Sequence, residues 1–146
     1  MPLFAYGTLQ DEDVLAALLG RPAAIATLPL AIATGFKAVA YPGRVYPALV
    51  PCPGAAAPGR LIAPLTPLDL AVLDGFEGEE YRRAALTVQR DGVDIPAQAY
   101  LPVIDIPADG PAWSLPHWLA HHKAGMLAGE TGTARDLRQR FSALLA

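Results

Sequence analysis

The sequence has a single cysteine. Cys52 cannot form a disulfide within the chain, and one thiol cannot make a cysteine-based metal site. A reducing cytoplasm is therefore the simplest compartment. Because Pro51 and Pro53 flank it in an apolar run, we expect Cys52 to be an inert packed residue and not a catalytic thiol.

The sequence also lacks a strong excess of charge of either sign. The chain has 11 basic and 14 acidic residues, scattered along its length, and a formal net charge of −3. Such a distribution provides no basic patch for nucleic acid and none for an anionic membrane surface. We expect a small-molecule partner; nothing in the sequence indicates an oligomeric state.

Long hydrophobic runs are absent as well. The two longest uncharged stretches, 22–36 and 45–59, are too short to span a bilayer and contain prolines. The N-terminus has no basic segment before an apolar stretch, so no secretory signal is predicted. At 146 residues and 53% hydrophobic composition, the sequence predicts one soluble, cytoplasmic domain over residues 1–146.

Fifteen prolines and thirteen glycines divide the chain into short apolar segments, a pattern typical of strands joined by turns. The predicted strands are Leu3 to Tyr6, a stretch near Ile25 to Ile32, Lys37 to Tyr41, Ala48 to Val50, Arg60 to Ala63, Ala85 to Arg90 and Ala97 to Leu101.

Three helices are predicted from their end signals. In "DEDVLAALLG" acids occupy the first turn, four apolar residues share one face, and Gly20 can end the helix. In "TPLDLAVLDGFEG" Thr66 can cap, Pro67 suits the first position, and Gly75 is expected to stop the helix after Leu73. "TARDLRQRFSALLA" is predicted to be a third helix, with a cap at Thr133 and a buried stripe of Leu137, Phe141 and Leu144. Strands with a few short helices indicate an α+β protein.

The segment "FAYGTLQ", residues 4–10, places a glycine turn between a strand and a helix. Three interpretations compete: a phosphate cradle, a nucleophile on a bend, and a backbone site for another anion. The Gly-x-x-x-x-Gly-Lys pattern of phosphate loops is missing, and Thr8 lacks the Gly-x-Ser-x-Gly surround of a nucleophile. The N–H groups of Gly7, Thr8 and Leu9 could bind an anion, although the segment alone is better explained by a plain structural turn.

A second informative segment is "LDGFEGEEYRR", residues 73–83. Glu77 lies between two glycines, follows Phe76, and is expected just past a helix end. A carboxylate beside an aromatic ring in a closed pocket has a raised pKa, which suits a general base or acid; the alternative is an acid on a surface loop. We expect Glu79 and Glu80 to be solvated, with Arg82 or Arg83 paired to them.

A metal site is a further alternative, because His117 and His121 would lie one turn apart on a helix, next to His122. No third ligand is evident in the sequence pattern. We therefore predict no metal and interpret these histidines as surface or partly packed residues.

Taken together, "YGTL" near the N-terminus, "YPALV" at 46–50, "LDGFEGEEYRR" at 73–83 and "AYL" at 99–101 resemble the gamma-glutamylcyclotransferase-like family. Their order and spacing match over roughly the first two thirds of the chain, and the motifs are far more specific together than singly. The resemblance implies a small mixed β-barrel with peripheral short helices. It also implies an enzyme that releases 5-oxoproline from a gamma-glutamyl compound.

The resemblance assigns roles residue by residue. Tyr6, Gly7, Thr8 and Leu9 would form the loop that holds the glutamyl group, Glu77 would act as general base and acid, and Tyr100 would lie near the substrate. The substrate's own α-amine attacks its γ-carbonyl, so the reaction needs a folded substrate and a proton carrier but no metal or organic cofactor. The alternative is a binding module that keeps the fold without catalysis.

Overall fold

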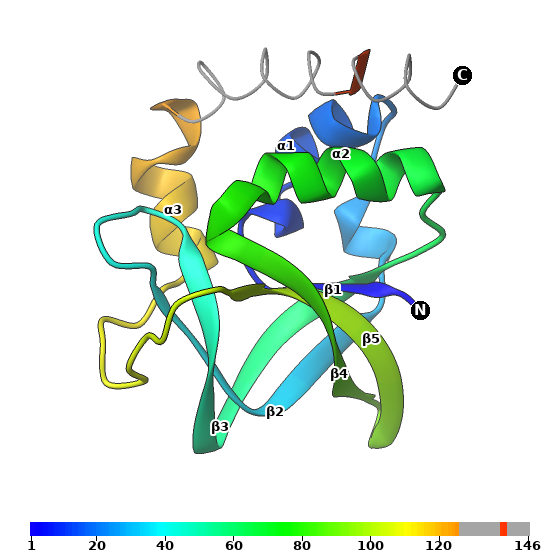
Figure 1. The fold of residues 1–146 in the computed structure, drawn as a ribbon. Helices are drawn as coiled ribbons and strands as arrows, with labels where there is room; N and C mark the ends of the chain where they lie inside the picture. The colour runs from blue at the N-terminus through cyan, green and yellow to red at the C-terminus, as the bar shows by residue number, and fades with distance from the viewer. Residues whose placement is uncertain (126–137, 140–146) are drawn as a thin grey trace.

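A computed structural model of the protein describes residues 1–125 and 138–139 (Figure 1). Within this part of the chain, five strands close into a barrel in the order β1-β3-β2-β4-β5. Pairing is antiparallel except between β1 and β5, which are parallel, so the barrel is mixed. The strands are β1 (Leu3–Ala5), β2 (Leu30–Ala40), β3 (Pro47–Ile62), β4 (Tyr81–Arg90) and β5 (Val93–Pro102).

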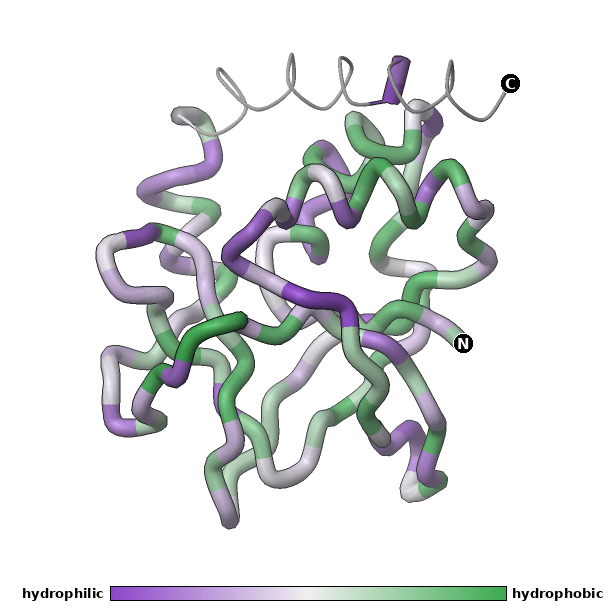
Figure 2. The backbone as a smooth tube through the Cα atoms, viewed as in Figure 1, coloured by the Kyte–Doolittle hydropathy of each residue, from purple (hydrophilic) through white to green (hydrophobic). Residues whose placement is uncertain are grey.

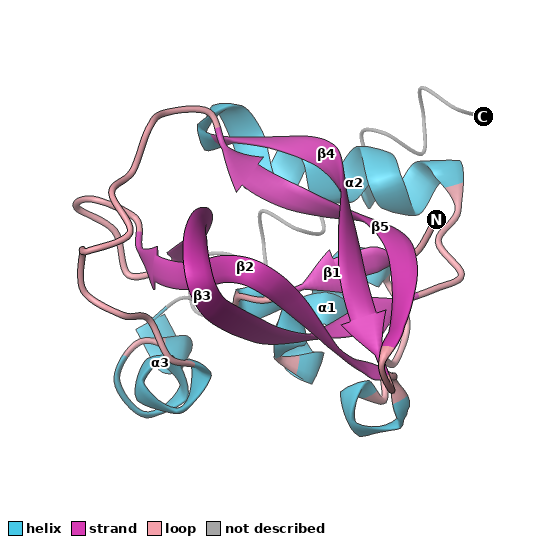
Figure 3. Cartoon of the chain, turned by 90° about the horizontal axis from the view of Figure 1, so that it is seen from below, coloured by secondary structure: helices cyan, strands magenta, loops and turns pink. Residues whose placement is uncertain are grey.

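The helices lie outside the barrel. They are α1 (Glu12–Leu19), α2 (Pro67–Glu77) and α3 (Leu115–His121), with the short 3-10 helices η1 (Thr8–Gln10), η2 (Ile25–Thr27) and η3 (Gly78–Glu80). The view from below the barrel shows the strands in front and the helices around them (Figure 3). The predicted fold class, an α+β protein with a small mixed barrel and peripheral short helices, is confirmed.

Strand β1 is buried on both faces. Leu3 and Ala5 belong to the hydrophobic cluster shared with the helices, whereas Phe4 and Tyr6 belong to the cluster inside the barrel. This split follows from the alternation of side chains along a strand. Several alanines fill the narrow barrel interior beside the larger side chains. Tyr6, the residue after β1, therefore packs on the inside of the barrel, directly before the glycine turn.

Strands β2 and β3 are longer than predicted. Each merges segments that the prolines and glycines had separated in the prediction, and Ile25–Thr27 is a 3-10 helix instead of a strand. The two strands pair from Leu30 with Arg60 to Ala40 with Pro47, and their register shifts between Thr34 and Phe36. This bulge takes up residues 52–55 of β3, which include a proline and a glycine, without ending the strand.

Helix α1 begins and ends as predicted. The Asp11 carboxylate accepts a hydrogen bond from the Val14 N–H, and Gly20 ends the helix with φ of 68°. A hydrophilic stretch runs from the end of α2 into β4 (Figure 2).

Helix α2 begins as predicted but continues further. Thr66 and Asp69 form a capping box, and Pro67 is the first helical residue. Gly75 does not end the helix; it ends at Glu77, followed by Gly78 with φ of 67°. The expectation that Glu77 follows a helix end was wrong, because the positive φ that favours glycine occurs at Gly78 instead.

Asp69 anchors α2 to its surroundings. Its buried carboxylate accepts hydrogen bonds from Arg21 at 2.9 and 3.0 Å and from Arg138 at 3.1 Å. Although burial acts in the opposite direction, bonds from Arg21, from the Thr66 N–H and from Arg138 hold the pKa of Asp69 well below its usual range. The predicted helix after Thr133 lies outside the described residues except for 138–139.

Among the described residues, no helix is both long and apolar enough to cross a membrane.

Candidate functional site

A pocket of about 550 Å³ opens at the end of the barrel where β1 leads into η1. It collects residues from β1, η1, the end of α2, β5 and α3, which are far apart in sequence. Every site residue predicted from the sequence, namely Tyr6, Gly7, Thr8, Leu9, Glu77 and Tyr100, lines it. Its other lining residues are Phe4, Ala5, Val45, Tyr46, Pro47, Phe76, Glu80, Tyr81, Trp118, His121, His122 and Gly125.

The loop of residues 6–9 supplies backbone donors to this pocket. Thr8 and Leu9 are buried at the start of η1. The N–H groups of Gln10 and Asp11 donate to the carbonyl oxygens of Gly7 and Thr8. Within the described chain, the N–H groups of Gly7, Thr8 and Leu9 donate no such bond, so they are available to an anionic or carbonyl oxygen of a ligand.

Gly7 is required by close packing. A Cβ built on it would lie 2.9 Å from Cγ and 3.3 Å from Cδ of Pro47, the first residue of β3. The loop therefore approaches β3 more closely than any other residue type would allow.

Gly7→Ala is expected to lower the free energy of unfolding by about 1–3 kcal/mol, because the added methyl group must push apart the loop and Pro47. Urea denaturation measures the change. Gly110→Ala is the matched control, since its Cβ would lie 3.6 Å from its nearest neighbour, the Pro107 carbonyl oxygen, and it should change stability by less than about 0.5 kcal/mol. Equal stability of the two variants would show that the loop has room to spare.

Glu77 presents a carboxylate to the pocket from the last turn of α2. Val72 and Leu73 bury the preceding turn and so fix the helix against the core. Burial, together with the nearby carboxylates Asp74 and Glu80, raises the pKa of Glu77 to about 8. Its carboxylate has no hydrogen bond or ion pair within residues 1–125 and 138–139. The group is thus poised to gain or lose a proton near neutral pH.

Two tyrosines connect the loop to the barrel wall beside Glu77. The Tyr6 hydroxyl donates to the Tyr100 carbonyl oxygen, and the Tyr100 hydroxyl donates to Asp74 Oδ1 at 2.7 Å. Asp74 is also held by Arg83, whose Nε lies 3.0 Å from Oδ1. Tyr100 lines the pocket, and because its hydroxyl proton is already donated to Asp74, that hydroxyl is not a free donor to a ligand.

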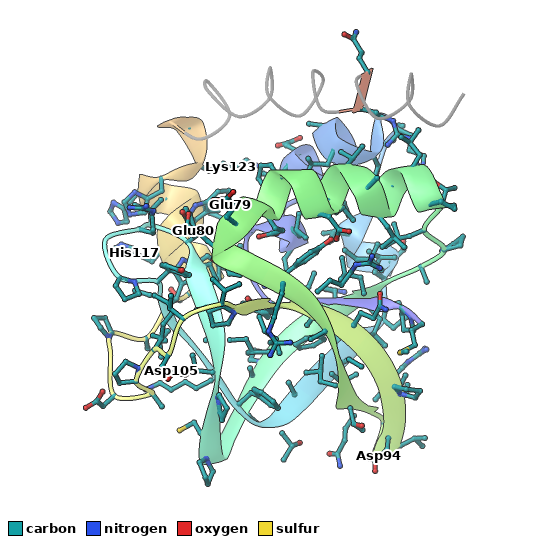
Figure 4. The ribbon with its side chains drawn as sticks, viewed as in Figure 1. Glu79, Glu80, Asp94, Asp105, His117 and Lys123 are labelled. Atoms are coloured by element: carbon teal, nitrogen blue, oxygen red, sulfur yellow. The ribbon has the colours of Figure 1, made fainter. Side chains whose placement is uncertain are left out.

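Glu80 is a pocket residue that the sequence interpretation placed in solvent. Its carboxylate accepts a short hydrogen bond from Tyr46 and lies 3.5 Å from Arg44 Nε. Figure 4 shows Glu80 at the end of α2, facing α3, and Glu79 beside it. Glu79 is exposed, as expected. The expected ion pairs with Arg82 or Arg83 were wrong, because Arg83 is bound to Asp74 instead.

An aromatic cluster beside Glu80 contributes Tyr46 and Tyr81 to the pocket wall. Tyr41, Tyr46 and Tyr81 pack with ring centroids 5.6–6.1 Å apart. The Tyr81 hydroxyl donates to the Pro47 carbonyl oxygen, which ties this cluster to the residue against which Gly7 packs. Tyr46 and Tyr81 occur inside the "YPALV" and "LDGFEGEEYRR" motifs, so the motifs contained a signal for them.

Helix α3 and the residues after it complete the pocket with Trp118, His121 and His122. No sequence signal pointed to these residues as a pocket wall. The rings of His117 and His121 have centroids 4.3 Å apart, and that of His122 lies 5.6 Å from His117. Among the described residues, no group of three or more histidine, cysteine, aspartate or glutamate side chains is arranged to hold a metal ion.

Comparison with curated proteins finds several relatives from Arabidopsis thaliana. AIG2-like protein D is 34% identical over 141 residues, which cover 92% of this chain and 90% of the relative. AIG2-like protein A is 36% identical over 91 residues, which cover 61% of this chain but only 52% of the relative. The chain thus matches about half the length of one relative and nearly all of the other.

Solved structures agree with these relatives. A solution structure from Arabidopsis thaliana has a TM-score of 0.64 at 27% identity and covers 87% of this chain and 85% of its own. A structure described as a gamma-glutamyl cyclotransferase has a TM-score of 0.56 at 18% identity, covers 70% of this chain and 66% of its own, and shows a shared fold. The family described as "Gamma-glutamyl cyclotransferase, AIG2-like" matches residues 3–119. The resemblance seen in the motifs is therefore confirmed, and the chain belongs to the AIG2-like gamma-glutamyl cyclotransferase family.

Proposed function

We propose that the protein releases 5-oxoproline from a gamma-glutamyl amine, amino acid or related metabolite, with Glu77 as general base and general acid. One observation carries the proposal: the Glu77 carboxylate, with its raised pKa, lines the same pocket as the free N–H groups of Gly7, Thr8 and Leu9. An acid on a surface loop would be solvated and would have no such neighbours. Family membership supports the same reaction class.

The reaction starts with proton removal. The Glu77 carboxylate takes a proton from the substrate's α-ammonium group, and the resulting amine attacks the γ-carbonyl carbon of the same molecule. A carbon–nitrogen bond forms, closing a five-membered ring, and the carbonyl oxygen becomes negatively charged. Because both reacting groups belong to one molecule, the pocket supplies catalysis mainly by holding it folded.

The leaving group departs in the second step. The tetrahedral intermediate expels the nitrogen of the original amide, and that carbon–nitrogen bond breaks as the carbonyl re-forms. The α-ammonium loses two protons in all and the leaving nitrogen gains two, so the Glu77 carboxylate can carry each in turn. A carboxyl group with a pKa of about 8 releases and accepts protons with comparable ease at neutral pH, which suits this double task.

The N–H groups of the loop can stabilise the negative charges of the substrate. The substrate carries an α-carboxylate, and its carbonyl oxygen becomes an oxyanion during the reaction. Neutral N–H donors can stabilise either charge without pairing with Glu77. The described residues that line the pocket include no lysine or arginine, so none of these side chains competes as a cation for the Glu77 carboxylate.

A substrate screen tests the proposal. The purified protein is incubated with a panel of gamma-glutamyl amines and gamma-glutamyl dipeptides, and 5-oxoproline is quantified by mass spectrometry. We expect turnover of at least one class of leaving group. Binding of panel members without any 5-oxoproline would contradict the proposal and favour the alternative, a non-catalytic binding module on the same fold.

A further inference from the structure

Trp118 contains a buried donor that nothing in the described chain satisfies. Its side chain is completely buried, and its indole Nε1 is the one buried side-chain polar atom among the described residues without a hydrogen-bond partner. Leaving a buried N–H unpaired costs free energy. The other tryptophan, Trp113, shows the usual arrangement, because its Nε1 donates to the Val45 carbonyl oxygen at 2.8 Å. The unpaired indole of Trp118 is therefore a specific feature that needs a reason.

The position of Trp118 suggests that reason. Trp118 lines the pocket together with Gly7, Thr8 and Leu9, and it shares a hydrophobic cluster with Leu9. Its indole is thus packed next to the loop whose own N–H groups have no partner in the described chain. Residues with unpaired donors from two separate elements, β1–η1 and α3, thus line one pocket.

An ion pair keeps these two elements together. Lys123, just after α3, lies 2.8 Å from Asp11 Oδ1 and 2.8 Å from Asp13 Oδ2. Asp11 ends η1 and caps α1, so it follows directly on the loop. Figure 4 shows Lys123 above Glu80, where α3 comes near the end of α2. The contact holds the end of α3, and with it Trp118, at a defined position against η1.

The charges around the pocket indicate which ligand group these donors fit. Glu80, and Glu77 whenever it is ionised, would repel an anion, and no lysine or arginine is among the described residues that line the pocket. A carboxylate that enters the pocket must therefore be bound by uncharged N–H groups away from both glutamates. Hydrogen bonds from N–H groups to a carboxylate are stronger than those between neutral partners.

We propose that Trp118 binds the substrate: its indole N–H donates a hydrogen bond to the α-carboxylate of the glutamyl group, next to the N–H groups of Thr8 and Leu9. This inference rests on the proposed function for the identity of the ligand. It adds a side chain from α3 to the binding site and gives the pocket a polarity, with the carboxylate against η1 and Trp118 and the reacting amine toward Glu77.

NMR with the reaction product as probe tests the inference without requiring turnover. The chain has two tryptophans, so a ¹H–¹⁵N spectrum contains two indole N–H signals, which the Trp113→Phe variant assigns. On titration with 5-oxo-L-proline we expect a large shift of the Trp118 indole signal that saturates together with the Thr8 and Leu9 amide signals. The Trp113 indole should move less, because Trp113 does not line the pocket and its N–H already donates to the Val45 carbonyl oxygen. 2-Pyrrolidinone, the same ring without the carboxylate, should leave the Trp118 indole unshifted.

Trp118→Phe provides the affinity readout, because it removes the N–H donor and keeps an aromatic ring; the smaller ring also leaves space at this fully buried position. We expect the Kd for 5-oxo-L-proline to rise about tenfold or more, as for a hydrogen bond to a charged group. Trp113→Phe should leave the Kd unchanged, and matching urea midpoints would exclude a folding effect.

Two results would overturn the inference. Shifts of the Thr8 and Leu9 amides with an unmoved Trp118 indole would remove Trp118 from the site and leave the proposed function intact. If neither the Thr8 and Leu9 amides nor the Trp118 indole shifts at high concentrations of 5-oxo-L-proline, in a protein that does release 5-oxoproline, then neither set of donors binds the carboxylate. If the Trp118 indole shifts but the protein yields no 5-oxoproline, the result supports carboxylate binding by Trp118 and refutes the proposed enzymatic activity.

Discussion

Replacing Glu77 by glutamine is expected to lower kcat/KM for 5-oxoproline release by about a hundredfold to ten-thousandfold, the usual contribution of a positioned general acid–base group. Glutamine preserves the size of the side chain and can still accept a hydrogen bond, but it cannot take up a proton from the α-ammonium. Substrate binding should change little, because the loop amides remain. Initial rates at several substrate concentrations separate the effect on kcat from that on KM.

The pH dependence of the unmodified protein provides a second test of the same assignment. Because the base must be ionised in the free protein, kcat/KM should increase with pH through an apparent pKa of about 8. Glu79→Gln is the matched control, since Glu79 is exposed and does not line the pocket. Its rates should equal those of the unmodified protein. Full activity of the Glu77 variant would contradict this assignment and indicate that Glu80, the other carboxylate among the described pocket residues, is the base.

Local signals predicted the parts of the fold that depend on a few neighbouring residues. The Asp11 cap and Gly20 stop of α1, and the Thr66 cap of α2, are set by hydrogen bonds between residues three or four positions apart. The end of α2 was predicted too early, because glycine permits a positive φ but does not require one. Gly75 can continue a helix, and the turn occurs at Gly78, where φ is positive.

The long strands β2 and β3 could not be predicted from such signals. Prolines and glycines usually mark turns, and residues 51–59 contain three prolines and two glycines. In the structure the register shift gathers part of this segment into a bulge, and the remainder pairs with the adjacent strand β2. Pairing partners that are distant in sequence, from Phe36 with Pro51 to Ala31 with Gly59, decide the outcome, and single-sequence patterns do not contain that information.

The residues of the candidate site also fall into two groups: those that a local motif predicts and those that only long-range packing brings to the pocket. The "YGTL" loop and Glu77 were predicted because each belongs to a motif, and the structure brings them into one pocket. Trp118 and His122 were missed because their segment carries no motif. They reach the pocket through packing of α3 on η1 and the Lys123 ion pair with Asp11, which are long-range contacts. That Glu77 and the loop act in catalysis stays a prediction.

The stability of the protein should decrease with pH because of Glu77, independently of any substrate. The pKa of Glu77 is about 8 in the folded protein, above its ordinary value of 4.5. Between these values the unfolded chain releases the proton and the folded protein retains it, so folding binds a proton and becomes less favourable as pH increases. Below pH 4.5 both states are protonated, and above pH 8 both are ionised, so the loss is confined to this window.

Glu77→Gln removes this dependence, since glutamine carries no charge at any pH. The variant should be of similar stability at pH 4.5 and more stable by about 2–4 kcal/mol at pH 9; that range is set below the full pKa shift because the side chain borders an open pocket. Urea denaturation of both proteins at intervals from pH 4.5 to 9 measures the difference, in which the titration of all other groups largely cancels. Glu79→Gln should show a difference that is small and constant. A Glu77→Gln difference that does not change with pH would mean that Glu77 ionises like a solvated acid, and the pocket would then lack a base whose proton affinity matches neutral pH.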